Sequence, residues 1–166
     1  SAASAIGLED VDPIRLASEN FSSTMRVFDV AARVRASRVV FSSTAFTAGW
    51  CHKSTQRRPA SLPLAEEHVA PHESYALSKI CCEHAAAMYA ASTEQQTTFV
   101  SLRFTNIVKR EKWHERPWSY SDWSASTTTT MADGEPVPPP LPLAFWAWTH
   151  EDDVLDAHIA ALEDPD

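Results

Sequence analysis

A tyrosine and a lysine four residues apart, Tyr75 and Lys79, are the residues of this chain best suited to acid–base chemistry. They lie in the stretch PHESYALSK (71–79), which opens with a proline and reads as the start of a helix. Positions i and i+4 share a helix face, so the two side chains would point the same way. An ammonium held beside a phenol favours the phenolate and lowers the pKa of the phenol. The pair is therefore a candidate for proton transfer, and the alternative is a half-buried tyrosine beside a solvated lysine.

The elements that would position this pair alternate along the chain. Helical periodicity and β-branched runs predict helices at 12–34, 73–92 and from 149 onward, and strands at 38–43, 97–104 and 143–149. Thr149 is expected to cap the last helix, with Asp152 as the capping-box residue. Alternation at this spacing favours the α/β class, with parallel strands joined by crossover helices.

The same periodicity predicts which side of each helix is buried. On the first helix the expected face consists of Ile14, Ala17, Phe21, Thr24, Phe28 and Ala31. On the second it consists of Leu77, Ile80, Cys81, His84, Met88 and Ala91. Between the two later strands, residues 109–142 lose all periodicity and contain many prolines and tryptophans, which predicts a long loop or partial disorder.

Composition narrows the class of protein. The chain has 166 residues, of which 44% are hydrophobic and 22% charged, as expected for one domain with a substantial core. A net charge of −8 without a basic stripe argues against a nucleic-acid partner. No apolar run approaches the roughly 18 residues that span a bilayer. Three cysteines, two of them adjacent, do not form a disulfide framework, and this favours a reducing cytoplasm.

Four further stretches, in order and at matching spacing, accompany PHESYALSK. They are NFSST (20–24), RVVFSSTAFTAG (38–49), SLRFTN (101–106) and WTHEDDVLDAH (148–158). Together the five motifs resemble the extended short-chain dehydrogenase/reductase superfamily, in particular its NAD-dependent epimerase/dehydratase family. They cover most of residues 1–108 and 143–166.

The resemblance implies a Rossmann-like, doubly wound parallel sheet and an NAD or NADP cofactor. It also implies tyrosine-assisted hydride transfer, in which Tyr75 moves the proton, Lys79 lowers its pKa and binds the cofactor ribose, and Thr44 steadies the substrate hydroxyl. Residues expected at the cofactor are Lys79, Tyr75, Ser42, Phe104 and Thr105, and those expected at the substrate are Asn20, Asn106 and Thr44. The partner is then a small molecule, and a homodimer is an option. His150 and Asp153 are interpreted as structural residues at the start of the last helix.

The chain departs from the family pattern in its glycines. The family opens with a strand and a G-x-x-G-x-x-G turn that holds the cofactor diphosphate, whereas this sequence contains only Gly7, Gly49 and Gly134. SAASAI at positions 1–6 resembles the end of the family's fourth strand. The fold is therefore expected to be incomplete at its N-terminus. We divide it into 1–108 (the C-terminal part of a dinucleotide-binding domain), 109–142 (a substrate-covering loop) and 143–166 (a strand and helix of the same domain).

Substrate class is suggested by one further departure. Family members that handle nucleotide sugars carry a diphosphate-binding arginine where this chain has Trp146, and an indole cannot replace a guanidinium in that role. Ala48 also replaces a tyrosine usual in the turn, which opens space. The preferred substrate is therefore a small sugar, sugar acid or polyol, with a nucleotide sugar as the alternative.

Two other readings remain open. A non-catalytic cofactor-binding protein or inactive fragment of the same fold would share every motif, because a fold alone does not establish activity. The second alternative is a zinc site. Its candidate ligands cluster in sequence: Cys51, His52, His68, His72, Cys81, Cys82 and His84. We expect no metal, because Cys51–His52 and Cys81–Cys82 are adjacent pairs and the His68–His72 spacing contains a proline.

Overall fold

The computed structural model describes residues 12–49, 63–92, 96–112 and 148–164. Its elements, in chain order, are α2 (Pro13–Arg33), β1 (Arg38–Thr44), the 3₁₀ turn η1 (Ala45–Ala48), α3 (Ser74–Ser92), β2 (Thr98–Phe104), β3 (Asn106–Val108), the 3₁₀ turn η2 (Arg110–Lys112), β4 (Trp148–His150) and α5 (Glu151–Glu163). Most of the proposed loop 109–142 and positions 143–147 of the proposed last strand lie outside the described residues. No helix in the described part of the chain is long and apolar enough to cross a membrane.

The described strands form two parallel pairs. Strand β1 pairs with β2 from Arg38 opposite Thr98 to Thr44 opposite Phe104, so both strands end at the same edge. Strands β3 and β4 pair in the same sense, from Asn106 opposite Trp148. The predicted parallel pairing of the first two strands is confirmed.

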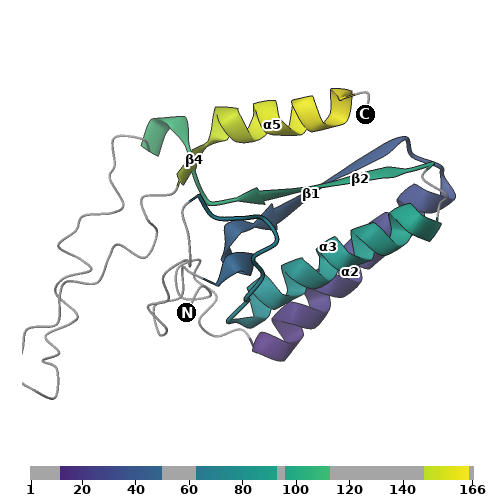
Figure 1. Ribbon diagram of the computed structural model, residues 1–166, viewed down its shortest axis with the longest axis horizontal. Helices are drawn as coiled ribbons and strands as arrows, with labels where there is room; N and C mark the ends of the chain where they lie inside the picture. Colours follow the sequence, from purple (N-terminus) through teal and green to yellow (C-terminus); the bar gives the residue numbers. More distant parts are fainter. Residues whose placement is uncertain (1–11, 50–62, 93–95, 113–147, 165–166) are drawn as a thin grey trace, which may run out of the picture.

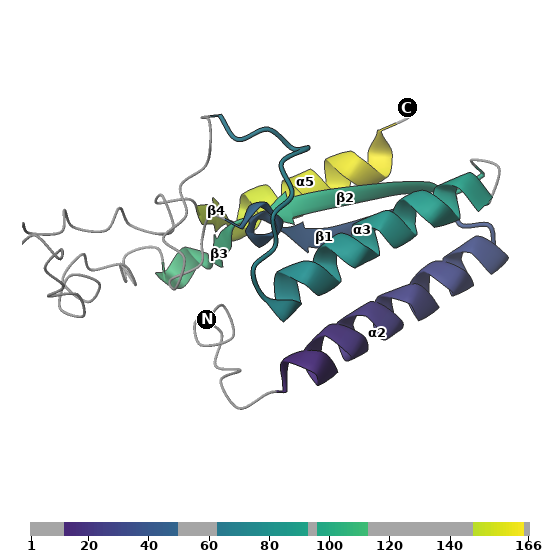
Figure 2. The same ribbon diagram turned by 60° about the horizontal axis from the view of Figure 1, so that its bottom comes forward.

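Helices cover both faces of the β1–β2 pair, as a doubly wound sheet requires (Figures 1 and 2). Helix α5 lies along one face, and α3 lies on the other with α2 beside it. The fold is therefore the predicted α/β, Rossmann-like arrangement. It presents the carboxyl ends of β1 and β2 at one edge, where parallel sheets bind their ligands.

The core lies between the β1–β2 pair and the two helices beneath it. Phe28 of α2 is 1% exposed and meets three aromatic rings edge-on, at centroid distances of 5.8 Å for Phe41, 6.1 Å for Tyr89 and 5.1 Å for Phe99. Edge-to-face pairs of this kind add about 0.5–1.5 kcal/mol each beyond their buried area. This cluster anchors α2 and α3 to the sheet.

The predicted face of α2 is confirmed only in its second half. Phe28 and Ala31 are buried, whereas Ile14 is 78% and Phe21 37% exposed. Periodicity identifies residues that share a face, but it does not say how far along the helix a neighbouring element covers that face. Asp12 caps the helix by accepting a hydrogen bond from the Ile14 amide at 3.0 Å.

The predicted face of α3 is partly wrong. Leu77 and Met88 are each about half exposed, and the buried positions are Ala76, Ser78, Ile80, Cys82, Ala85 and Ala86. Helix α3 packs against α2 on one side and the strands on the other. Small side chains allow this close double contact, so size rather than hydrophobicity decides which side of α3 is buried.

Candidate functional site

The candidate site is built first from the end of β1. Thr44, 6% exposed, is the last residue of the strand and caps η1 by accepting a hydrogen bond from the Phe46 amide at 3.3 Å. The turn closes at Gly49, whose φ of 75° lies in the left-handed region. A Cβ at Gly49 would lie 1.9 Å from the carbonyl oxygen of Ala70, so only glycine permits this approach. The segment before α3 is thus held against the end of β1.

Helix α3 begins beside this turn and carries Tyr75 in its first turn. The carboxylate of Glu73 caps the helix by accepting hydrogen bonds from the amides of Tyr75 (2.8 Å) and Ala76 (2.7 Å). The Ala70 amide donates to the Thr47 carbonyl at 2.9 Å, which fixes the approach to the helix. The position of Tyr75 is therefore determined by a capped helix start and a braced turn.

Tyr75 and Thr44 meet through their hydroxyl groups, which are hydrogen-bonded to each other. Burial raises the pKa of Tyr75 above its ordinary value, and the negative charge of Glu73 raises it further, while the bond to Thr44 opposes both effects. Thr44 thus has two roles in the structure, because it caps the turn and also contacts the phenol.

Lys79 lies one turn beyond Tyr75 and reaches the same region. Its ammonium donates a hydrogen bond to the main-chain carbonyl of Ser42 at 2.7 Å and lies 5.7 Å from the ring centroid of Tyr75. It also lies 4.8 Å from the ring centroid of Phe41. Burial lowers the pKa of Lys79, while the neighbouring Cys82 thiol acts in the opposite sense.

The structure corrects the expected direction of the Tyr75 pKa. We expected Lys79 to lower it, but desolvation of the phenol outweighs the other influences. Burial therefore disfavours both the phenolate and the ammonium when each is taken alone. A phenolate and an ammonium formed together would offset this cost through their mutual attraction. With its pKa raised, Tyr75 carries its proton at neutral pH, so taking a proton from a substrate hydroxyl requires the phenolate to form first.

Asn20, expected at the substrate, lies between the two helices. Its side-chain amide donates to the hydroxyl of Ser78 at 3.3 Å, and that hydroxyl donates to the Tyr75 carbonyl at 2.7 Å. The structure thus brings Asn20 into the support of the first turn of α3.

The other expected cofactor residues point to the opposite side of the sheet. The Ser42 hydroxyl lies 2.8 Å from Nε2 of His158, and Phe104 stacks on the same imidazole at a centroid distance of 5.2 Å. The Thr105 and Thr149 hydroxyl oxygens lie 2.9 Å apart. These side chains contact α5 and β4, so the structure gathers Thr44, Tyr75 and Lys79 without the side chains of Ser42, Phe104 or Thr105.

The residue expected to cap the last helix is wrong by one position. His150 rather than Thr149 caps α5, since its Nδ1 accepts a hydrogen bond from the Asp152 amide at 3.2 Å. The Thr149 hydroxyl is engaged with Thr105, so the neighbouring residue takes the cap.

Asn106 lies on β3, but its side chain is outside the described residues, and so is Trp146.

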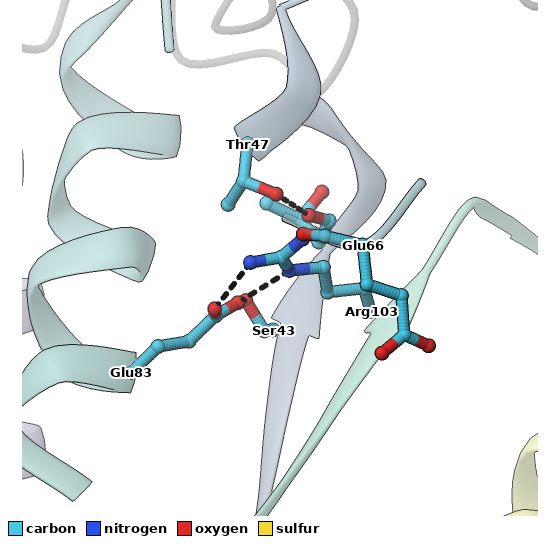
Figure 3. A network of polar contacts seen from close by, with 6 residues as sticks. Ser43, Thr47, Glu66, Glu83 and Arg103 are labelled. Carbon is cyan, nitrogen blue, oxygen red and sulfur yellow. Dashed lines mark hydrogen bonds and ion pairs between the residues drawn. The ribbon is translucent and has the colours of Figure 1, made fainter. Parts of the chain in front are cut away.

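Sequence reasoning missed a polar cluster behind the site, formed by Ser43, Glu66, Glu83 and Arg103 (Figure 3). Arg103 donates to both carboxylate oxygens of Glu83, from Nε at 2.9 Å and from Nη2 at 2.6 Å. Glu83 follows Lys79 by four residues, as Lys79 follows Tyr75, and this repeated spacing was the signal that could have identified it.

The zinc reading gains no support from the described residues. Among them, no three histidine, cysteine, aspartate or glutamate side chains are grouped as a metal ion would require. Cys51 and His52 lie outside the described part of the chain.

The sequence matches one known protein family. A sequence model described as the NAD dependent epimerase/dehydratase family matches residues 1–166. A search of curated protein sequences finds no match.

Solved structures resemble the chain in fold. A UDP-N-acetylglucosamine 4-epimerase from Methanobrevibacter ruminantium M1, in complex with UDP-N-acetylmuramic acid, has a TM-score of 0.63 and 19% identity over 93% of this chain and 47% of its own. The Bordetella bronchiseptica enzyme WbmG, in complex with NAD, has a TM-score of 0.58 and 22% identity over 93% and 44%. A UDP-glucose 4-epimerase from Brucella ovis, in complex with NAD, has a TM-score of 0.57 and 21% identity over 87% and 45%. The chain thus spans less than half the length of each.

Proposed function

The chain belongs to the NAD-dependent epimerase/dehydratase family, and from that premise we propose that the protein catalyses tyrosine-assisted hydride transfer at a carbinol carbon of a sugar-like substrate. The observation that carries the proposal is the meeting of Thr44, Tyr75 and Lys79 at the carboxyl end of β1. Ligands of parallel α/β sheets bind at this edge.

NAD, the cofactor in the family's name, would accept and return the hydride when bound. The residues present fit the ribose side of such a cofactor. An ammonium has three N–H donors, and Lys79 directs one to the Ser42 carbonyl. We infer that Lys79 and Tyr75 also bind the ribose hydroxyls.

Each of the three residues has a distinct task. As the phenolate, Tyr75 takes the proton of the substrate hydroxyl when the carbinol is oxidised, and as the phenol it returns that proton when the carbonyl is reduced. Lys79 supplies the positive charge that makes the phenolate accessible in a desolvated site. The Thr44 hydroxyl donates a hydrogen bond that steadies the substrate oxygen beside the phenol.

The Tyr75→Phe variant of the natural full-length protein tests the proposal. It removes the proton-transfer group and keeps the ring, so kcat should fall by about 10²–10⁴-fold while substrate affinity changes less. Tyr89→Phe is the matched control, because Tyr89 belongs to the aromatic cluster around Phe28 and Phe99. Near-normal turnover by the Tyr75 variant would exclude Tyr75 as the acid–base group.

The proposed substrate is a free sugar, sugar acid or polyol, and this choice is carried by Trp146 in the sequence. A nucleotide sugar is the second candidate, supported by the nucleotide-sugar epimerases among the structures of similar fold. Assays of both substrate classes with NAD and NADP separate the two. Turnover of nucleotide sugars alone would overturn the first candidate, and turnover of neither would favour a non-catalytic cofactor-binding protein. Cytoplasmic location and a homodimer remain predictions.

A further inference from the structure

The polar cluster of Ser43, Glu66, Glu83 and Arg103 joins three parts of the molecule that meet at the candidate site (Figure 3). Ser43 and Arg103 are direct partners across the β1–β2 pair. Glu83 comes from α3, one turn beyond Lys79. Glu66 belongs to the segment that leads from the turn after β1 to the start of α3.

Glu83 and Arg103 link the residues of the cluster through hydrogen bonds. Glu83 accepts from the Ser43 hydroxyl at 2.5 Å in addition to its two bonds from Arg103. The remaining terminal nitrogen of Arg103 donates to the main-chain carbonyl of Glu66 at 2.5 Å. Only a planar guanidinium can make a forked contact with a carboxylate and also reach a third acceptor, so the set fixes α3 and the segment around Glu66 relative to the sheet.

The cluster adjoins the reacting groups along the chain. Ser43 immediately precedes Thr44, and Glu83 lies on the helix that carries Tyr75 and Lys79. The side chains of Arg103 and Glu83 are 23% and 14% exposed, so their contact is largely shielded from water. A largely buried ion pair is a weak source of net stability, because desolvation offsets most of its attraction. The geometry of the Arg103–Glu83 pair is therefore more informative about its role than its contribution to stability.

We propose that Arg103 and Glu83 are positioning residues, which hold α3 at the distance from the end of β1 at which the Tyr75 phenol and the Thr44 hydroxyl meet. This rests on the proposed function for its catalytic meaning, but the geometric link can be tested without turnover. Neither residue contributes directly to the Tyr75 pKa, whereas the Thr44 hydrogen bond lowers that pKa. A change at Arg103 that moves the Tyr75 pKa must therefore act through the geometry.

The test is an NMR titration of the 166-residue chain carrying ¹³C-labelled tyrosine, which reports three tyrosines. Arg103→Lys keeps the positive charge but loses the paired hydrogen bonds to Glu83. The Tyr75 pKa should then rise as it does in Thr44→Ala, because both changes remove the hydrogen bond between Tyr75 and Thr44. The double variant Thr44→Ala/Arg103→Lys should have a Tyr75 pKa no higher than that of Thr44→Ala alone. Arg38→Lys is the matched control, since Arg38 also donates to a main-chain carbonyl, that of Ala161 at 2.8 Å, at the far end of β1.

An unchanged Tyr75 pKa in Arg103→Lys, or a rise that adds fully to that of Thr44→Ala, would overturn the proposal. If Arg103→Lys does not fold, the double variant Glu83→Met/Arg103→Met gives the same reading, because it leaves no charge unpaired. In the natural full-length protein, Arg103→Lys should lower kcat by about 10–100-fold with KM within about twofold. A titration as expected, in a protein that turns over no substrate, would retain the positioning link and reject the proposed function.

Discussion

At the scale of single residues, the site depends on side chains that serve two partners at once. Thr44 caps a turn and contacts the phenol, and Glu73 caps α3 and raises the pKa of that phenol. Glu83 has the same character, since it is both the partner of Arg103 and the acceptor for Ser43. Each double role ties the chemistry of the site to the integrity of the fold.

The pH dependence of stability should reveal Glu83. Burial alone would raise its pKa, but hydrogen bonds from Arg103 and Ser43 bring it below the ordinary value of 4.5. A carboxylate whose pKa is lower in the folded chain stabilises that chain above pH 4.5, and this contribution is lost as the pH falls through the folded-state pKa. Glu83→Gln should therefore lower the free energy of unfolding by about 1–2 kcal/mol at pH 7, and by progressively less below pH 4.5.

Urea unfolding of both proteins across this pH range measures the difference. Glu67→Gln, at an exposed position, controls for the loss of one negative charge. A difference between Glu83→Gln and the parent chain that does not depend on pH would contradict the expectation.

At the scale of elements, α2 is followed by a left-handed residue that is not glycine. Arg35, just after the helix, has a φ of 55°, a left-handed conformation that costs a residue with a Cβ about 1–2 kcal/mol. Arg35→Gly removes this cost but increases the entropy of the unfolded chain, so we expect a net gain of about 0.5–1 kcal/mol in the free energy of unfolding.

The measurement is again urea unfolding, with Arg35→Ala as the control. Alanine removes the guanidinium and keeps the Cβ, so its stability should remain within about 0.5 kcal/mol of the parent. A glycine variant no more stable than the alanine variant would show that the backbone at Arg35 is not strained.

The same scale shows what sequence could and could not predict. Alternating patterns located the helices and the parallel strands, and the Tyr75–Lys79 spacing predicted two side chains that the structure brings near each other at the candidate site. Burial on α3 could not be predicted, because Ala85 and Ala86 face two neighbours while Leu77 and Met88 do not. The pairing of Arg103 with Glu83 depends on strand register, which a single sequence does not reveal.

At the scale of the whole molecule, the 166 residues combine the candidate site at the end of β1 with a sequence that has only three glycines. Close glycine backbone and helix N-terminal amides normally anchor the diphosphate of a dinucleotide. We therefore expect this chain to bind NAD more weakly than about 10 μM, or −7 kcal/mol. Isothermal titration calorimetry measures this directly, with AMP as a control for the adenosine half. Tighter binding would mean that other residues hold the diphosphate.

The anchors of the site have a consequence for how the sequence can change over evolutionary time. Lys79 is held by the main-chain carbonyl of Ser42, and Arg103 by that of Glu66. Every amino acid carries this carbonyl, so mutations at positions 42 and 66 leave the acceptor in place. For these two contacts the selective constraint therefore falls on the donors, Lys79 and Arg103.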